Sequence, residues 1–285
     1  VMDSLCWADA FRYTEHRVTL RSDVVIEQRK GYETGDYLGA PFRLLGRYDF
    51  EASNNFRVGL TAESDAGEPW FLHGGQGFDL YRGFVEASNL SKITRAVVGA
   101  YRVGFGRGLL FGQQSYGNRL SQVLSRSSAS YGVSGYGGVS ELPTLVGAAV
   151  AVGLNKFSVT PFYGYTSLDA DTTGGVWHSF STSGYHRSAN EIARRSTLGL
   201  HTVGLNMAYN QRFVNVGVTA YGGFFSLPAV VGVDDWSAND FVGNYQWGVS
   251  VDYGFHKNRV WLSGETALVQ GLSVATTNSL LIRPL

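Results

Sequence analysis

The side chains most able to do chemistry lie in the polar segments that separate apolar stretches of the sequence. Ser134 in YGVSGYGG could act as a nucleophile, with a histidine as base and Asp234 or Asp235 as the orienting acid. The histidines open to that role are His73, His178, His186 and His201. A nucleophile elbow requires glycine two positions before and two after the serine, and Gly-Val-Ser-Gly does not supply both. The sequence therefore predicts no enzyme, and a hydrolase at the rim of the fold is the least favoured interpretation.

Two groups of residues could be considered as metal ligands. His186 and Glu191 in GYHRSANEIARR lie five residues apart, and one histidine with one carboxylate is not a recognisable ligand set. Acidic residues of the long polar segments could bind calcium weakly or keep those segments soluble, and the second interpretation is favoured. They are Asp169, Asp171, Asp234, Asp235 and Asp240. We expect neither a metal nor a cofactor.

The segment Gly104–Gly108, with the sequence GFGRG, resembles a glycine-rich phosphate loop. Such a loop needs a strand before it and a helix N-terminus after it, and no helical pattern follows here. The favoured interpretation is a strand end where glycines allow bends and close packing.

Composition favours many strands over helices. The 285 residues include 37 Gly, 17 Phe, 16 Tyr and only 6 Pro, and charged residues make up 16%. The formal net charge is zero, which argues against a surface that coats nucleic acid. No apolar run approaches the roughly 20 residues that a membrane helix requires. Cys6 is the one cysteine, so no internal disulfide is possible.

Strict alternation marks the elements that must position these residues. In residues 244–255 every second side chain is apolar and those between are polar or glycine. The apolar set is Tyr245, Trp247, Val249, Val251, Tyr253 and Phe255. Similar alternation runs through segments that begin near residues 15, 42, 56, 157, 202 and 214. About twelve strands of mostly 9–14 residues are predicted, longer than the five or six residues of an average soluble strand.

The predicted connections alternate between short and long. Short polar turns are expected near 53–55, 89–92, 155–156, 211–212 and 256–258. Long connections are expected near 31–38, 66–76, 105–145, 169–197 and 226–243, with a shorter one near 269–274. This asymmetry is typical of bacterial outer-membrane barrels and has no counterpart in Greek-key sandwiches.

The charged faces decide which side meets lipid. Charges are costly against lipid but tolerable in a hydrated or ion-paired lumen. The predicted lumen-lining charged residues are Arg17, Arg21, Asp23, Arg43, Arg47, Asp49, Arg57, Glu63, Asp65, Arg82, Glu86 and Arg102. The predicted lipid-facing aromatic residues are Tyr245, Trp247, Tyr253 and Phe255, and Trp261 is expected in an interfacial girdle.

The predicted fold is an all-β, antiparallel, up-and-down transmembrane β-barrel with about 12 strands visible, which either form the whole barrel or are part of a larger one. Residues 1–285 form one domain with an N-terminal lead-in over 1–14. The long loop 105–145 either folds into the lumen or over the mouth, or is a mobile surface loop.

Several stretches carry a family resemblance: GLTAESDAGEPWF (59–71), GFDLYRGFVE (77–86), VVGAYRVGFGRGLLFG (97–112), SGYHRSANEI (183–192) and GETAL (264–268). In these stretches, and in their order and spacing, the chain resembles Bacteroidota outer-membrane β-barrel proteins of the helix-hairpin-helix-domain-containing family. The likeness covers the barrel portion only, because no helix-hairpin-helix module is visible here. It implies a location in the cell outer membrane and a barrel fold, and no DNA-binding role is carried over.

The expected function is a porin-like pore or a component of a transport or translocation complex. The alternative is a scaffold barrel with a closed, ion-paired lumen that docks partner proteins. Expected partners are outer-membrane lipid and other outer-membrane or periplasmic proteins, with no nucleic acid bound.

Overall fold

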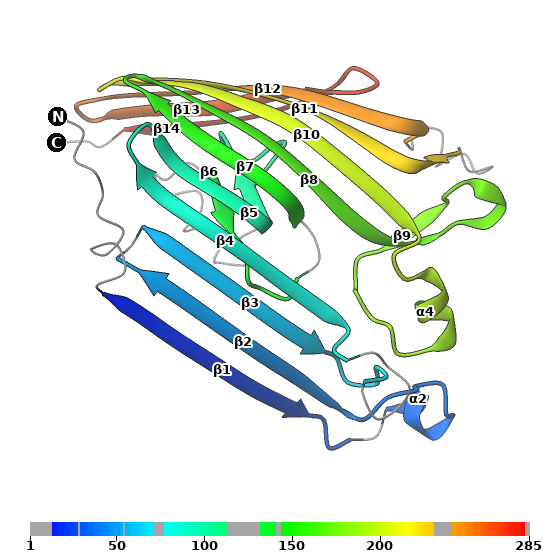
Figure 1. Ribbon diagram of the computed structural model, residues 1–285. Helices are drawn as coiled ribbons and strands as arrows, with labels where there is room; N and C mark the ends of the chain where they lie inside the picture. The colour runs from blue at the N-terminus through cyan, green and yellow to red at the C-terminus, as the bar shows by residue number, and fades with distance from the viewer. Residues whose placement is uncertain are drawn as a thin grey trace.

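The protein forms one curved antiparallel sheet, shown in a computed structural model that describes residues 13–27, 29–53, 55–70, 77–112, 132–140, 144–230 and 241–282 (Figure 1). Twelve strands follow one another in chain order across the sheet. They are β1 (Thr14–Val24), β2 (Phe42–Ala52), β3 (Phe56–Ser64), β4 (Leu80–Leu90), β5 (Ile93–Gly104), β7 (Leu145–Leu154), β8 (Phe157–Asp171), β10 (Leu198–Asn210), β11 (Val214–Ala229), β12 (Gly243–Lys257), β13 (Val260–Val269) and β14 (Ser273–Ile282). The predicted all-β, up-and-down architecture of about twelve strands is confirmed.

The remaining elements are short. Strand β6 (Gly132–Gly135) pairs with β5, and β9 (Ser179–Ser181) pairs with β8. The helices of the described residues are α2 (Lys30–Glu33), α4 (Ala189–Arg194) and the 3-10 turn η1 (Thr173–Gly175). The two ends of the strand order, β1 and β14, do not pair with each other, so the sheet is open along one side (Figure 1).

The tight connections lie at one edge of the sheet, except the three-residue turn between β13 and β14, which lies at the other. Each hairpin from β2–β3 to β12–β13 that turns there has only a few residues, while the opposite edge carries most of the long connections. Residues in the left-handed region make these turns possible, and Asn155 at φ 56° and Asn258 at φ 53° are examples. Asparagine tolerates this region better than most side chains do.

The strand register joins the alternating faces into two continuous surfaces. One row across β12, β11, β10 and β8 consists of Val251, Val218, Met207 and Val159. The neighbouring row, on the opposite face of the same four strands, consists of Ser250, Thr219, Asn206 and Thr160. The valines and the methionine of the first row face outward, whereas every residue of the second row is at most 6% exposed on the concave side.

At Gly99 the fifth strand changes partner. Pairing between β4 and β5 ends at Phe84 and Gly99, and beyond that point β6 takes the place of β4 beside β5. Gly99 has φ +98°, and a Cβ built there would lie 2.3 Å from the carbonyl oxygen of Gly83. A glycine is required because the left-handed backbone and the close approach both exclude a side chain.

Replacing Gly99 with alanine is expected to lower the free energy of unfolding by about 1–2 kcal/mol, since an L side chain is strained in this region. Thermal unfolding in detergent, followed by circular dichroism, measures the loss. Gly46→Ala is the matched control, because its Cβ would meet only Leu20 at 3.8 Å. Equal losses in the two variants would contradict the assigned role of Gly99.

Candidate functional site

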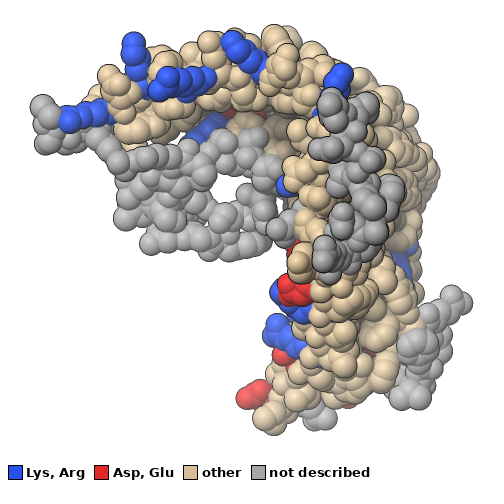
Figure 2. Space-filling model, turned by 60° about the vertical axis from the view of Figure 1, so that its left-hand side comes forward, with Lys and Arg blue, Asp and Glu red and all other residues tan. Residues whose placement is uncertain are grey.

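The concave face of the sheet is the candidate site, because it gathers most of the buried polar groups. Figure 2 shows the chain as an arch with a hollow concave side, and acidic and basic groups along the inner side of its lower limb. Buried polar residues of this face include Thr61, Glu63, Glu86, Thr160, Thr202, Asn206, Thr219, Ser250 and Glu265. On the convex face most large side chains are apolar and exposed, among them Leu20, Leu60, Val98, Val203, Met207 and Leu280.

Ion pairs connect the predicted luminal charges of β2, β3 and β4. Arg43 contacts Glu63 at 2.5 Å and also Asp65, at 3.2 Å, in the segment that follows β3. Arg47 contacts Asp49 on its own strand at 2.7 Å. The carboxylates of these pairs are more buried than the arginines, so the charges compensate one another on the inner wall.

Glu86 joins two arginines on either side of its strand. Arg57 of β3 and Arg95 of β5 each lie 3.6 Å from its carboxylate. Arg95 was not among the predicted luminal residues, because β5 alternates less clearly than its neighbours. Glu86 also accepts a hydrogen bond from the backbone N–H of Gly135 at 2.7 Å, which links the wall to the segment inside it.

The charges of β1 pair within their own strand. Arg17 contacts Glu15 at 2.6 Å, and Arg21 contacts Asp23 at 2.8 Å. These side chains are roughly half to two-thirds exposed, and surface ion pairs of this kind add little stability. They line the inner face of a strand whose outer edge is unpaired.

The segment 132–140 lies against the inner face of β3 and β4. The Thr61 hydroxyl donates to the carbonyl of Gly137 at 2.7 Å, and Arg82 donates to the carbonyls of Gly138 and Ser140. Tyr136 stacks under the guanidinium of Arg102, whose Cζ lies 3.4 Å from the ring centroid. The predicted charges Arg82 and Arg102 therefore hold this segment in place. We name residues 132–140 the luminal segment.

The residues after β5 cross to the opposite inner wall. Glu265 of β13 is 1% exposed and accepts hydrogen bonds from the backbone N–H groups of Arg107 and Leu109, at 2.7 and 3.1 Å. Phe111 packs edge-on against Phe162 and Tyr221, whose ring centroids lie 5.2 and 5.1 Å away. The described parts of the predicted loop 105–145 thus lie on the concave side. Residues 113–131 and 141–143 of that loop lie outside the described residues.

A cluster of buried apolar side chains lies where the residues after β5 pack against the concave face. Tyr101, Val133 and Phe84 are at most 3% exposed and form part of it. Beside the cluster, at the tight-turn end, lies a cavity of about 550 Å³ with a mixed polar and apolar lining. The lining includes Thr160, Asn206, Asn215, Asp252, Ser263 and Ser279, one from each of six successive strands of the wall. The lumen is narrowed by protein on one side and open to a cavity on the other.

The predicted lipid-facing aromatic residues lie on the convex face of β12. Tyr245 and Phe255 are exposed, and Trp247 and Tyr253 are half-buried in the same alternating row. Trp261 is different, because it pairs in register with His256 and lines the luminal cavity. Trp261 therefore faces the concave side, and the expectation that it lies in an interfacial girdle on the lipid side is wrong.

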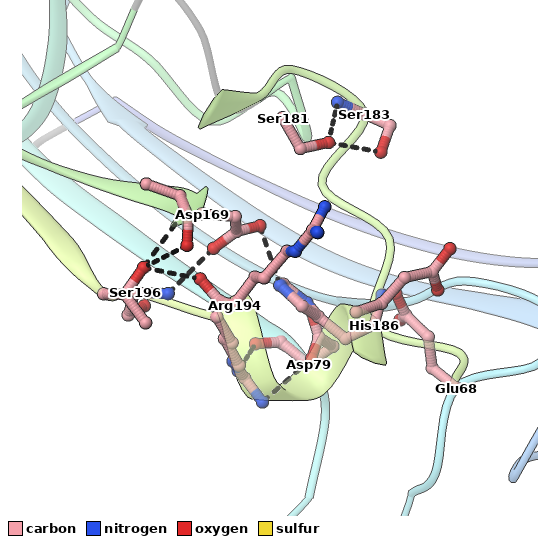
Figure 3. A network of polar contacts seen from close by, with 12 residues as sticks. Glu68, Asp79, Asp169, Ser181, Ser183, His186, Arg194 and Ser196 are labelled. Carbon is pink, nitrogen blue, oxygen red and sulfur yellow. Dashed lines mark hydrogen bonds and ion pairs between the residues drawn. The ribbon is translucent and has the colours of Figure 1, made fainter. Parts of the chain in front are cut away.

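A buried charged cluster, which the sequence did not reveal, lies where the long connections leave the sheet (Figure 3). His186, in the connection after β9, places Nδ1 2.7 Å from Asp79 and Nε2 2.8 Å from Asp169. Its backbone N–H donates to Glu68 at 3.0 Å. Glu191, which the sequence offered as the partner of His186, instead caps α4 together with Ser188. We name Glu68, Asp79, Asp169 and His186 the rim cluster.

The two residues of the rim cluster that lie in connections and have resolved shifts, His186 and Glu68, both have raised pKa values. Burial alone would lower the pKa of His186, but the hydrogen bonds to Asp169 and Asp79 outweigh it and raise the pKa to about 10. Burial, and then the charge of Asp79, raise the pKa of Glu68 to about 7. The atoms of Glu68, Asp79 and His186 that could bind a metal lie within 4.8 Å of one another.

The other candidates for chemistry are dispersed. Gly104 ends β5 and no helix follows it in the described residues, which agrees with a strand end rather than a phosphate loop. Ser134 lies in β6 and donates to the carbonyl of Gly135 next to it. His201 contacts the Tyr163 hydroxyl on the convex face. His73, Asp234, Asp235 and Asp240 lie outside the described residues.

No family model matches this chain, and no curated protein matches it. Among the described residues, none of the helices combines the length and the apolar character needed to cross a membrane.

Proposed function

We propose that this chain is the greater part of the wall of an outer-membrane β-barrel that acts as a constricted pore or as the channel component of a transport complex. One observation carries the proposal: apolar side chains are exposed on the convex face and polar side chains are buried on the concave face, the reverse of the pattern in a soluble protein. Convex rows such as Val251, Val218 and Met207 are exposed, while the concave row of Ser250, Thr219 and Asn206 is buried. In lipid this pattern is favourable, because the apolar rows meet acyl chains and the polar rows meet water.

The same proposal requires that the free edges of β1 and β14 be paired in the membrane. Backbone N–H and C=O groups cannot remain unsatisfied in the hydrocarbon region, so an open edge there would cost several kcal/mol per group. Strands additional to the twelve described ones would complete the wall between these two edges. The resemblance to the Bacteroidota barrel family agrees with such a location and with a larger barrel.

The inner wall favours passage of polar cargo past a constriction. Arg43 and Arg47 face the lumen on β2, and the luminal segment lies beside them. A scaffold barrel is the second candidate, favoured by the packed cluster around Tyr101, which fills part of the concave side. The two candidates differ in whether current passes and whether the wall charges set its selectivity.

Replacing both Arg43 and Arg47 with glutamate is expected to shift ion selectivity toward cations, because two positive charges of the wall become negative. Reversal potentials of the purified complete protein in planar bilayers, under a salt gradient, measure the shift. Arg259→Glu, in the tight turn between β12 and β13, is the matched control and should leave selectivity unchanged. A scaffold would instead give no current in either form, and the double variant would only lose stability, since Glu63 and Asp49 would lose their partners.

A further inference from the structure

Three residues of the rim cluster come from two distant connections of the chain and meet at one point. Glu68 follows β3, Asp79 precedes β4, and His186 lies between β9 and α4. Each is at most 9% exposed at its side chain or as a whole residue, and their ligand atoms lie within 4.8 Å of one another. Figure 3 shows these side chains converging beside the end of β8. A nitrogen and two carboxylate oxygens at such spacing are within reach of a single ion.

Asp169 fixes the orientation of the His186 ring from the Nε2 side. Its Nε2 lies 2.8 Å from Asp169, and the other oxygen of Asp169 accepts a hydrogen bond from the backbone N–H of Ser196 at 2.8 Å. Metal-binding histidines commonly donate their second ring N–H to a carboxylate in this way, which sets the tautomer and the direction of the free nitrogen. In this arrangement Nδ1 is the nitrogen that faces Asp79 and Glu68.

We propose that Glu68, Asp79 and His186 form a zinc site in which Asp169 positions the histidine. One imidazole nitrogen and two carboxylates are ligands that Zn²⁺ accepts, and three protein ligands leave a fourth position for water. Coordination through Nδ1 requires that this nitrogen carry no proton. The ion therefore replaces the proton between Nδ1 and Asp79, and that proton passes to the solvent.

The residues around the proposed zinc site carry a surplus of negative charge, and two cavities give a cation access to it. Acidic side chains around the site outnumber the basic ones. They are Glu63, Asp65, Glu68, Asp79 and Asp169, against Arg43, His186 and Arg195. One cavity of about 220 Å³ is lined by Asp79, Asp169 and His186, and a second of about 230 Å³ is lined by Glu63, Asp65 and Asp79. A cation can approach from either cavity, and the surplus of carboxylates would attract it.

A bound ion would tie the connection after β3 to the connection between β8 and β10. These connections lie at the same edge of the sheet and belong to strands that are not neighbours in the wall. The site does not depend on whether the lumen conducts, so its test is separate from that of the pore.

The test is zinc binding by the full chain, purified in detergent and freed of metal with a chelator. We expect one zinc per chain by elemental mass spectrometry after desalting, and loss of that zinc in His186→Ala. Asp169→Asn should weaken binding by about 10- to 100-fold in isothermal titration, since it removes only the group that orients the ligand. Glu191→Gln, five residues from His186 on the same connection, is the matched control and should bind as the unmodified chain does.

Circular dichroism of each variant separates loss of the site from loss of the fold. If His186→Ala does not fold, Glu68→Gln takes its place, because it keeps the shape of the side chain and removes the charge. The proposal is overturned if the unmodified chain binds no zinc, if it binds calcium in preference to zinc, or if the folded site variant retains the zinc with unchanged affinity.

Discussion

Replacing Leu262 with arginine is expected to lower the free energy of unfolding in lipid by about 1 kcal/mol, because Leu262 lies near the tight-turn end of β13, where the cost of a lipid-facing charge is below its value at the bilayer midplane. The same replacement at the adjacent Ser263 should leave the free energy of unfolding nearly unchanged. The two residues neighbour each other on β13 and face opposite sides of the sheet. Leu262 pairs in register with Phe255 in the exposed apolar row, and Ser263 pairs with Gly254 in the opposite row. An arginine at 262 would place its charge against acyl chains, while one at 263 would reach water.

Urea or guanidinium unfolding of the complete protein in lipid vesicles measures both values. The comparison is internal, because both variants add the same side chain to the same strand at nearly the same depth. Similar losses at both positions would mean that the convex face does not meet lipid. A chain that stayed folded and monodisperse in water without detergent would contradict the membrane assignment as well.

Replacing Glu265 with alanine is expected to cost about 2–3 kcal/mol and to release the segment that crosses the lumen after β5. Its carboxylate accepts the backbone N–H groups of Arg107 and Leu109. Each donor left without an acceptor in a buried setting costs roughly 1–3 kcal/mol. In the pore, the single-channel conductance should rise, because this segment no longer narrows the lumen. Denaturant unfolding and bilayer recording measure the two effects.

Glu265→Gln separates hydrogen bonding from charge. The glutamine keeps one oxygen that can accept from the same backbone groups, so its conductance should stay close to that of the unmodified protein. Arg107→Ala is a second comparison, because the contact uses the backbone of residue 107 and not its side chain. A rise in conductance in Glu265→Gln as large as that in Glu265→Ala would mean that the charge on the wall, and not the position of the segment, controls the current.

The strands of the wall were predictable because, in most of them, apolar and polar residues alternate and so identify the two faces from the strand's own sequence. Alternation in residues 244–255 is a local property, and the register that joins Met207 to Val218 follows because a tight turn connects β10 to β11. Alternation does not assign the faces of a strand such as β5, in which the pattern is weak. For this reason Arg95 was not predicted as a luminal residue. Trp261 was misplaced because an aromatic residue near a strand end was assigned by type and not by its register with His256.

The rim cluster could not be predicted from the sequence for a different reason. His186 lies 107 residues from Asp79 and 17 from Asp169, so no spacing within one segment could connect them. The nearby Glu191 was the obvious partner, but it serves the N-terminus of α4 through its capping box. The luminal segment was equally hidden, because its contacts with Thr61 and Arg82 depend on the curvature of the whole sheet.

The change of partner at Gly99 constrains the order in which the chain can assemble. Almost every strand of the wall pairs with its neighbour in sequence, so hairpins can form one after another with little loss of chain entropy. Two excursions interrupt this order, because β6 lies between β5 and β7 in the chain and β9 lies between β8 and β10. The described parts of the first excursion, residues 105–112 and 132–140, lie on the concave side, so they are expected to take that position before β7 pairs with β5. Assembly is thus expected to pause at the fifth strand, and a protease that cleaves the first excursion at this stage would trap a half-built sheet.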